Sequence, residues 1–116
     1  MNETQKTYLL AKAAFEAAQE AARREKPPFS GRGATDEEIE AYIEIEMEIE
    51  DRHGVWELFD LMLEARDAML AWAKAKVARD CAAEPRLDEA LSVFDRARKY
   101  PAIMDKLIDA ALRLKD

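Results

Sequence analysis

Apolar residues along this chain recur at the three- and four-residue spacing of an α-helix over most of its length. When the first segment is plotted at about 100° per residue, one side is apolar and consists of Leu10, Ala11, Ala14, Phe15, Ala17, Ala18, Ala21 and Ala22. This pattern predicts a first helix from about Thr4 to about Lys26, with Asn2 as a candidate N-cap and Gln5 three residues further on. Because its inner face is mostly alanine, a neighbouring helix can approach it closely.

Proline, glycine and threonine mark the ends of the second helix. Residues 27–34 read Pro-Pro-Phe-Ser-Gly-Arg-Gly-Ala and form the only clear loop. Thr35 followed by Glu38 is typical of a helix start, and Gly54 can close the helix in the left-handed conformation. Within the helix, residues 43–50 alternate apolar residues with glutamate, which is the period of a strand. We favour a helix because no other segment offers a partner strand; the alternative is a strand that pairs with a second copy in a homodimer.

Three further helices complete the predicted fold. The third runs over residues 55–81, and its predicted inner side is Leu58, Leu61, Met62, Ala65, Met69, Trp72 and Ala73. Pro85 suits the first turn of a fourth helix, and Pro101 opens a fifth. The sequence therefore predicts an all-α fold, a single small bundle of about five helices that spans residues 1–116 as one domain.

The charge of the chain is concentrated in its middle. Residues 35–67 hold 13 acidic residues and only Arg52 and Arg66 as basic ones, a net charge of −11, whereas the whole chain has a net charge of −7. An acidic face disfavours direct contact with nucleic acid or an anionic membrane and suits a basic protein surface. Cys81 is the single cysteine, and no secretory signal or long apolar run is present, so we expect a cytoplasmic protein.

Glu46, Glu50 and His53 are the first candidate metal ligands. On a helix they follow one another at spacings of four and three, near the middle of the apolar side. A carboxylate in such a place is unfavourable unless it is paired, protonated or bound to a cation. The last two residues form a Glu-x-x-His pair that resembles the ligand pair of ferritin-like di-iron proteins, although those proteins need two such pairs and this chain has one histidine. The alternative without a metal is that the glutamates pair with arginines such as Arg66 or Arg79.

A second resemblance covers residues 37–67. A glutamate-rich helix followed by Glu-x-x-Asp, which occurs here from Glu57 and again from Glu64, resembles the all-α nucleotide pyrophosphatases. The resemblance implies a Mg²⁺ or Mn²⁺ site with Glu57, Asp60 and Glu64 as weaker candidate ligands. The chain departs from that family at Ala41, where a further glutamate is expected.

The sequence as a whole favours a non-enzymatic protein-interaction module with no cofactor. Its acidic face over residues 35–67 would dock a basic surface or mimic nucleic acid, and the long third helix, apolar around much of its girth, would support a homodimer. The alternative is a divalent-metal-dependent enzyme of the pyrophosphatase type or a carboxylate metal-binding bundle.

Overall fold

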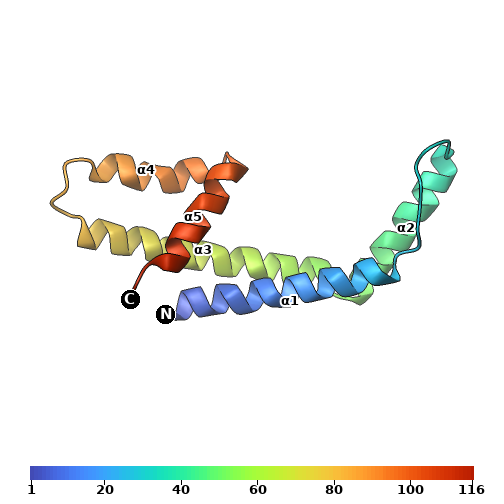
Figure 1. Cartoon of the computed structure of the whole chain (residues 1–116), viewed down its shortest axis with the longest axis horizontal. Helices are drawn as coiled ribbons and strands as arrows, with labels where there is room; N and C mark the ends of the chain where they lie inside the picture. Colours follow the sequence, from blue (N-terminus) through green and yellow to red (C-terminus); the bar gives the residue numbers. More distant parts are fainter. The chain divides into compact units, whose positions relative to one another are not determined.

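Five α-helices make up the fold in the computed structural model, which describes residues 1–116. They are α1 (Glu3–Glu25), α2 (Asp36–Arg52), α3 (Val55–Asp80), α4 (Leu87–Ala97) and α5 (Pro101–Arg113), and no strand is present (Figure 1). The predicted all-α class and five helices are thereby confirmed. The alternating segment 43–50 lies inside α2, as favoured over the strand.

The helices pack as two compact units. Unit 1 consists of Met1–Leu9 and Leu63–Asp116, and unit 2 of Leu10–Met62. Each unit has its own buried side chains: in unit 1 Gln5, Tyr8, Ala65, Met69, Leu70, Ala73, Ala97 and Ala111, and in unit 2 Ala22, Ile49 and Val55. Four of those eight residues in unit 1 are alanines, which lets its helices approach closely.

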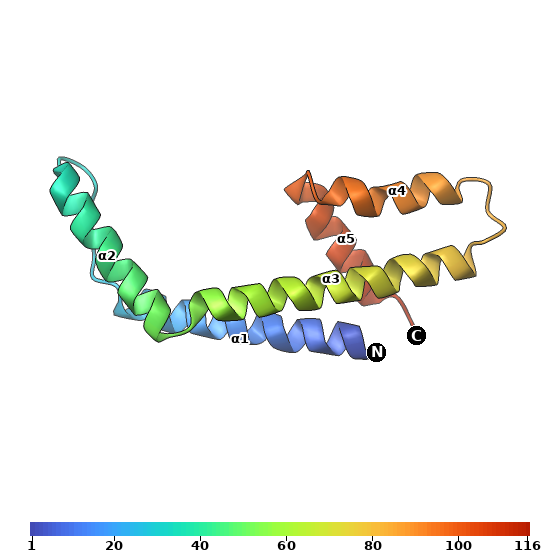
Figure 2. The ribbon, with the colours of Figure 1, turned by 180° about the vertical axis from the view of Figure 1, so that it is seen from behind.

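In unit 1, α4 turns back beside the second half of α3, and α5 crosses next to them (Figures 1 and 2). Met69 on α3 is fully buried, and Ala97 and Ala111 lie at the points where α4 and α5 pack. Pro101 is the first residue of α5, as predicted from its fixed φ and missing N–H.

Gln5 joins the beginning of α1 to the end of α5. Its Oε1 accepts a hydrogen bond from the Asn2 N–H at 2.7 Å, which completes the predicted capping arrangement. Its Nε2 donates to the carbonyl oxygens of Ala111 at 2.8 Å and Leu114 at 2.9 Å. The last carbonyls of a helix lack partners within the helix, so this buried amide satisfies groups that would otherwise be exposed or unpaired.

In unit 2, the end of α1, α2 and the first turns of α3 pack around small and aromatic side chains. Phe15 and Phe59 lie with their ring centroids 5.3 Å apart. In the loop, the ring of Phe29 stacks on Tyr42 at 4.4 Å, which holds the loop against α2. Gly54 has a φ of 66°, so the predicted left-handed end of α2 is confirmed.

One local prediction at a helix start was wrong. Pro85 lies before α4 rather than in its first turn, because the turn after α3 continues through the Leu87 N–H, which donates to the Glu84 carbonyl. At the start of α2, Thr35 is the N-cap as expected: its hydroxyl oxygen accepts from the Glu38 N–H, and the hydroxyl donates to the Glu38 carboxylate.

The predicted inner side of α3 was wrong at Leu61. This side chain is 53% exposed. Ala65, one turn further on and about 40° round the helix, is buried, so the neighbouring helices cover only part of the apolar side of α3. Of the two tryptophans, Trp56 is exposed, and Trp72, predicted on the inner side, is partly buried.

We predict that Gln5→Ala lowers the free energy of unfolding by about 1–3 kcal/mol, because the end of α5 loses the buried amide that donates to the Ala111 and Leu114 carbonyl oxygens. The control is Gln19→Ala, an exposed position on the same helix, which should change stability by less than about 0.5 kcal/mol. Urea denaturation measures both. Equal, small effects at the two positions would contradict the role assigned to Gln5.

Candidate functional site

Glu46 and Glu50 lie on the inner side of α2, where a single lysine contacts both. Lys26 Nζ is 2.7 Å from Glu50 Oε1 and 3.4 Å from Glu46 Oε2. The contact is partly buried, with 22% of the Lys26 side chain and 16% of the Glu50 side chain exposed. The hydrogen bond that Lys26 donates to Glu50, together with a weaker interaction with Glu46, raises the pKa of Lys26 above its ordinary value. The apolar side of α2 thus accepts two carboxylates because they are paired.

His53, the third candidate ligand, contacts the last residue of α1. Its Nε2 is 2.8 Å from Glu25 Oε1, and Arg52 donates to the other oxygen of the same carboxylate at 2.8 Å. Glu25, the last residue of α1, and Lys26, which follows it, therefore both contact the C-terminal half of α2.

The sequence identified the wrong partners for the inner glutamates. Arg66 pairs with Asp67 and Arg79 with Asp80, both neighbours in sequence. An arginine next to an aspartate forms that local contact at little entropic cost. The cation that reaches the inner glutamates is Lys26, directly after the end of α1.

The weaker candidates Glu57, Asp60 and Glu64 lie on the outer side of α3. All three are exposed, and none forms an ion pair. Nowhere in the chain do three histidine, cysteine or carboxylate side chains come together as a metal site requires. The geometry therefore gives the metal-dependent alternative no support, and that alternative stays a prediction.

Comparison of the chain with protein-family models, curated proteins and solved structures finds no match. None of the five helices combines the length and the apolar composition that crossing a membrane requires. Function is therefore inferred from the side chains themselves.

The outward side of α2 carries a row of carboxylates, here called the acidic stripe. It consists of Glu37, Glu40, Glu44, Glu48 and Asp51, which follow one another at spacings of three, four, four and three. These spacings place them on one face over about 21 Å of helix. All five are exposed, and none forms an ion pair or a side-chain hydrogen bond. The sequence indicated an acidic block but not this division between paired inner and free outer carboxylates.

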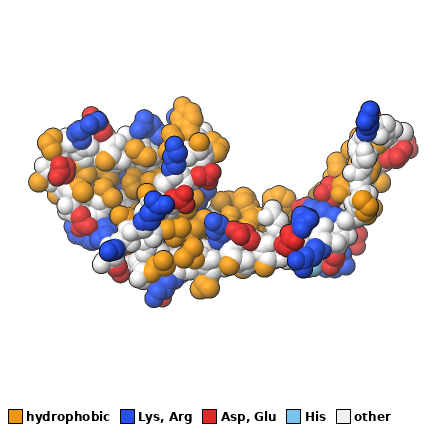
Figure 3. All heavy atoms as spheres, viewed as in Figure 1, with side chains coloured by type: hydrophobic (Ala, Val, Ile, Leu, Met, Phe, Trp, Pro, Cys, Tyr) orange, Lys and Arg blue, Asp and Glu red, His pale blue; other side chains and the backbone are white.

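Apolar side chains flank the acidic stripe. Ile43 and Met47 are one turn apart on one of its edges and are 46% and 56% exposed. Ile45, also exposed, lies nearer the opposite edge. Figure 3 shows hydrophobic and acidic side chains next to each other at the surface of α2. The outward side of α2 thus offers both charge and apolar area to a partner.

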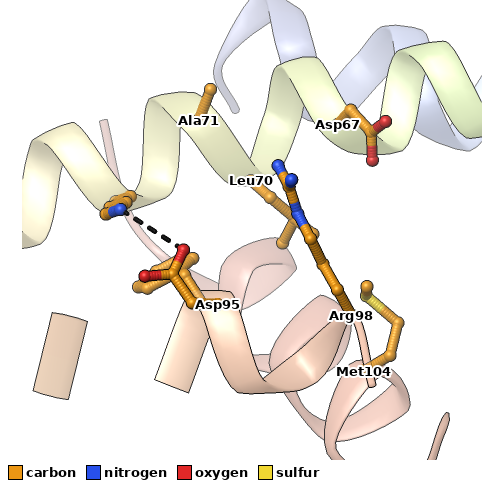
Figure 4. A pocket seen from close by; sticks show the side chains of 8 residues that line it. Asp67, Leu70, Ala71, Asp95, Arg98 and Met104 are labelled. Carbon is orange, nitrogen blue, oxygen red and sulfur yellow. Dashed lines mark ion pairs between the residues drawn. The ribbon is translucent and has the colours of Figure 1, made fainter. Parts of the chain in front are cut away.

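A groove of about 250 Å³ lies in unit 1 between α3, α4 and α5 (Figure 4). Its apolar part comes from Leu70, Ala71, Phe94 and Met104, and its charged part from Asp67, Lys74, Asp95 and Arg98. Lys74 Nζ is 3.8 Å from Asp95 Oδ1, so two of the four charges neutralise each other. With two acids and two bases, the groove favours neither cations nor anions.

We predict that Lys26→Met lowers the free energy of unfolding at neutral pH by about 1–3 kcal/mol, because two partly buried carboxylates lose their cation. Lys12→Met is the control, since Lys12 is more exposed and pairs with Glu16 at 3.9 Å. Urea denaturation at neutral pH measures both variants, and similar losses in both would contradict the assignment.

The pH dependence of the same contact follows from the pKa of Lys26. Because the folded-state pKa is raised, the contribution of Lys26 to stability is complete below its ordinary value of 10.5 and is lost as the pH rises through the folded-state value. The stability difference between the wild type and Lys26→Met should therefore be constant from about pH 7 to about pH 10 and shrink above it. A difference that already shrinks between about pH 7 and about pH 9 would contradict this assignment.

Thermal melting tests the metal alternative. Because no three ligands gather, we expect Mg²⁺, Mn²⁺ and Zn²⁺ to leave the melting temperature of metal-stripped protein unchanged. A rise of several degrees that Asp60→Ala abolishes would instead support the pyrophosphatase-like enzyme.

Proposed function

We propose that this chain is a protein-docking module that binds a basic protein surface through the acidic stripe of α2. The observation that carries the proposal is that five exposed carboxylates lie on one helix face and none of them forms an ion pair. A partner with clustered lysine and arginine would supply the missing positive charge.

The stripe is unfavourable for the isolated helix. Glu40, Glu44 and Glu48 are successive i,i+4 neighbours, and like charges at this spacing destabilise a helix by about 0.2–0.5 kcal/mol per pair. Elsewhere the chain places opposite charges at the same spacing, as in Lys12 with Glu16 and Lys76 with Asp80. The contrast supports a role for the stripe in binding, since it does not serve the stability of α2.

The neighbouring apolar side chains supply what charge alone does not. Exposed ion pairs contribute about 0–1 kcal/mol each and mainly steer and orient a partner. Burial of Ile43 and Met47 would add about 25 cal/mol for each Å² of apolar area removed from water. Methionine also adapts its shape to different partners.

The chemistry of the stripe restricts the kind of partner. A protein that normally binds nucleic acid has the clustered lysine and arginine that five carboxylates in a row would attract. In that case the stripe would occupy the place of the phosphates.

We predict that a lysine–leucine amphipathic peptide, as long as the 17 residues of α2, binds the chain in a salt-dependent manner. Replacing both Glu44 and Glu48 by glutamine should weaken binding about three- to tenfold, because two exposed ion pairs are lost. The control with the same charge change is Glu57→Gln with Asp60→Asn on α3. Isothermal titration measures all three proteins, and equal weakening in the two double variants would rule out a specific role for the stripe.

We also predict that Glu44→Lys raises the free energy of unfolding by about 0.5–1 kcal/mol, because two repulsive i,i+4 pairs become attractive. The same variant should bind the basic peptide less well. A loss of stability would show that Glu44 has a cationic partner within the chain and would contradict the free stripe.

A further inference from the structure

The C-terminal end of α4 carries the opposite charge to the acidic stripe. Arg96, Arg98 and Lys99, here called the basic corner together with Tyr100, lie in the last turn of α4 and the link to α5. All four residues are exposed, and none of the three cations forms an ion pair. Arg98 also lines the groove between α3, α4 and α5, and in Figure 4 its extended side chain reaches toward α3 beside Leu70.

The two compact units also differ in net charge: the unit that carries the acidic stripe is strongly negative, and the unit that carries the basic corner is close to neutral. Unit 2 contains 14 acidic and 6 basic residues, whereas unit 1 contains 11 acidic and 12 basic residues. One chain therefore presents a free acidic surface on one unit and a free basic surface on the other.

We propose that the partner of the acidic stripe is the basic corner of a second copy of this chain, so that copies associate head to tail. This inference rests on the proposed function of the stripe. The apolar groups match as well, since Tyr100 is 56% exposed beside the cations and Met47 is equally exposed beside the carboxylates. A tyrosine ring and a methionine side chain pack well together at interfaces.

The alternative symmetric arrangement is disfavoured by charge. In a two-fold dimer through α2, the stripe of one copy would face the stripe of the other, and like charges across an interface are strongly unfavourable. A head-to-tail contact that does not close on itself leaves one free stripe and one free corner, and association then continues beyond two copies, whereas closure into a reciprocal pair or a ring satisfies both surfaces.

The contact should be weak and sensitive to salt. Three exposed cations that face five carboxylates form only weak ion pairs, and screening removes most of their attraction at high ionic strength. The mass in solution should exceed the monomer mass of 13.2 kDa and rise with concentration at about 0.02 M salt, and fall to 13.2 kDa at about 0.5 M salt.

Two complementary variants test the arrangement by sedimentation equilibrium. In the first, Glu40, Glu44 and Glu48 are replaced by glutamine; in the second, Arg96, Arg98 and Lys99 are replaced by glutamine. Each variant alone should remain at 13.2 kDa at low salt, because one half of the contact is missing. Their equimolar mixture should form a complex of two copies that grows no further, since the free stripe of one binds the free corner of the other. Circular dichroism confirms that both variants fold.

Other outcomes overturn the inference. A wild-type chain that stays at 13.2 kDa at every concentration and salt would do so, and so would association that persists in both variants or fails to return on mixing. The lysine–leucine peptide separates this failure from that of the proposed function. If the wild type binds the peptide but does not associate with itself, the inference falls and the stripe is a docking surface for a different basic partner. If the wild type does not bind the peptide, both proposals fall together.

Discussion

The contact between Lys26 and two glutamates of α2 determines how the second unit is built. A carboxylate on the inner side of a helix is tolerated only with a cation, and Lys26 supplies one to both Glu46 and Glu50. Glu25 binds the end of the same helix through His53 and Arg52. Because these contacts fix which side of α2 faces α1, they also fix which side faces outward, and that side carries five carboxylates without partners.

This division explains why the acidic residues of α2 have two different roles. The inner glutamates stabilise the unit and are largely withdrawn from solvent, whereas the outer ones repel one another along the helix. Stability alone would favour lysines among the outer residues, as in the i,i+4 pairs of α1 and α3. A surface that lowers the stability of its own helix and is flanked by exposed Ile43 and Met47 has the properties of a docking site.

The periodicity of the chain was sufficient to predict the helices. Two of their ends were also predictable, because Gly54 and Pro101 act through backbone geometry that depends only on local sequence. The partner of Glu50 could not be predicted, because Lys26 is 24 residues away and reaches it through a loop. The exposure of Leu61 was equally hidden, since the pattern offers more apolar positions than the neighbouring helices cover. The spacing of the five outer carboxylates was sufficient to place the acidic stripe on one helix face. The alternation over residues 43–50 instead suggested a strand as the competing structure.

The most direct measurement is a map of amide chemical shifts in ¹⁵N-labelled protein during titration with the lysine–leucine peptide at low salt. If α2 is the docking surface, the shifts should concentrate between Glu37 and Asp51, be largest near Met47, and disappear when salt is added. Shifts confined to the groove between α3 and α4, or spread evenly over both units, would contradict the assignment of the binding surface to α2.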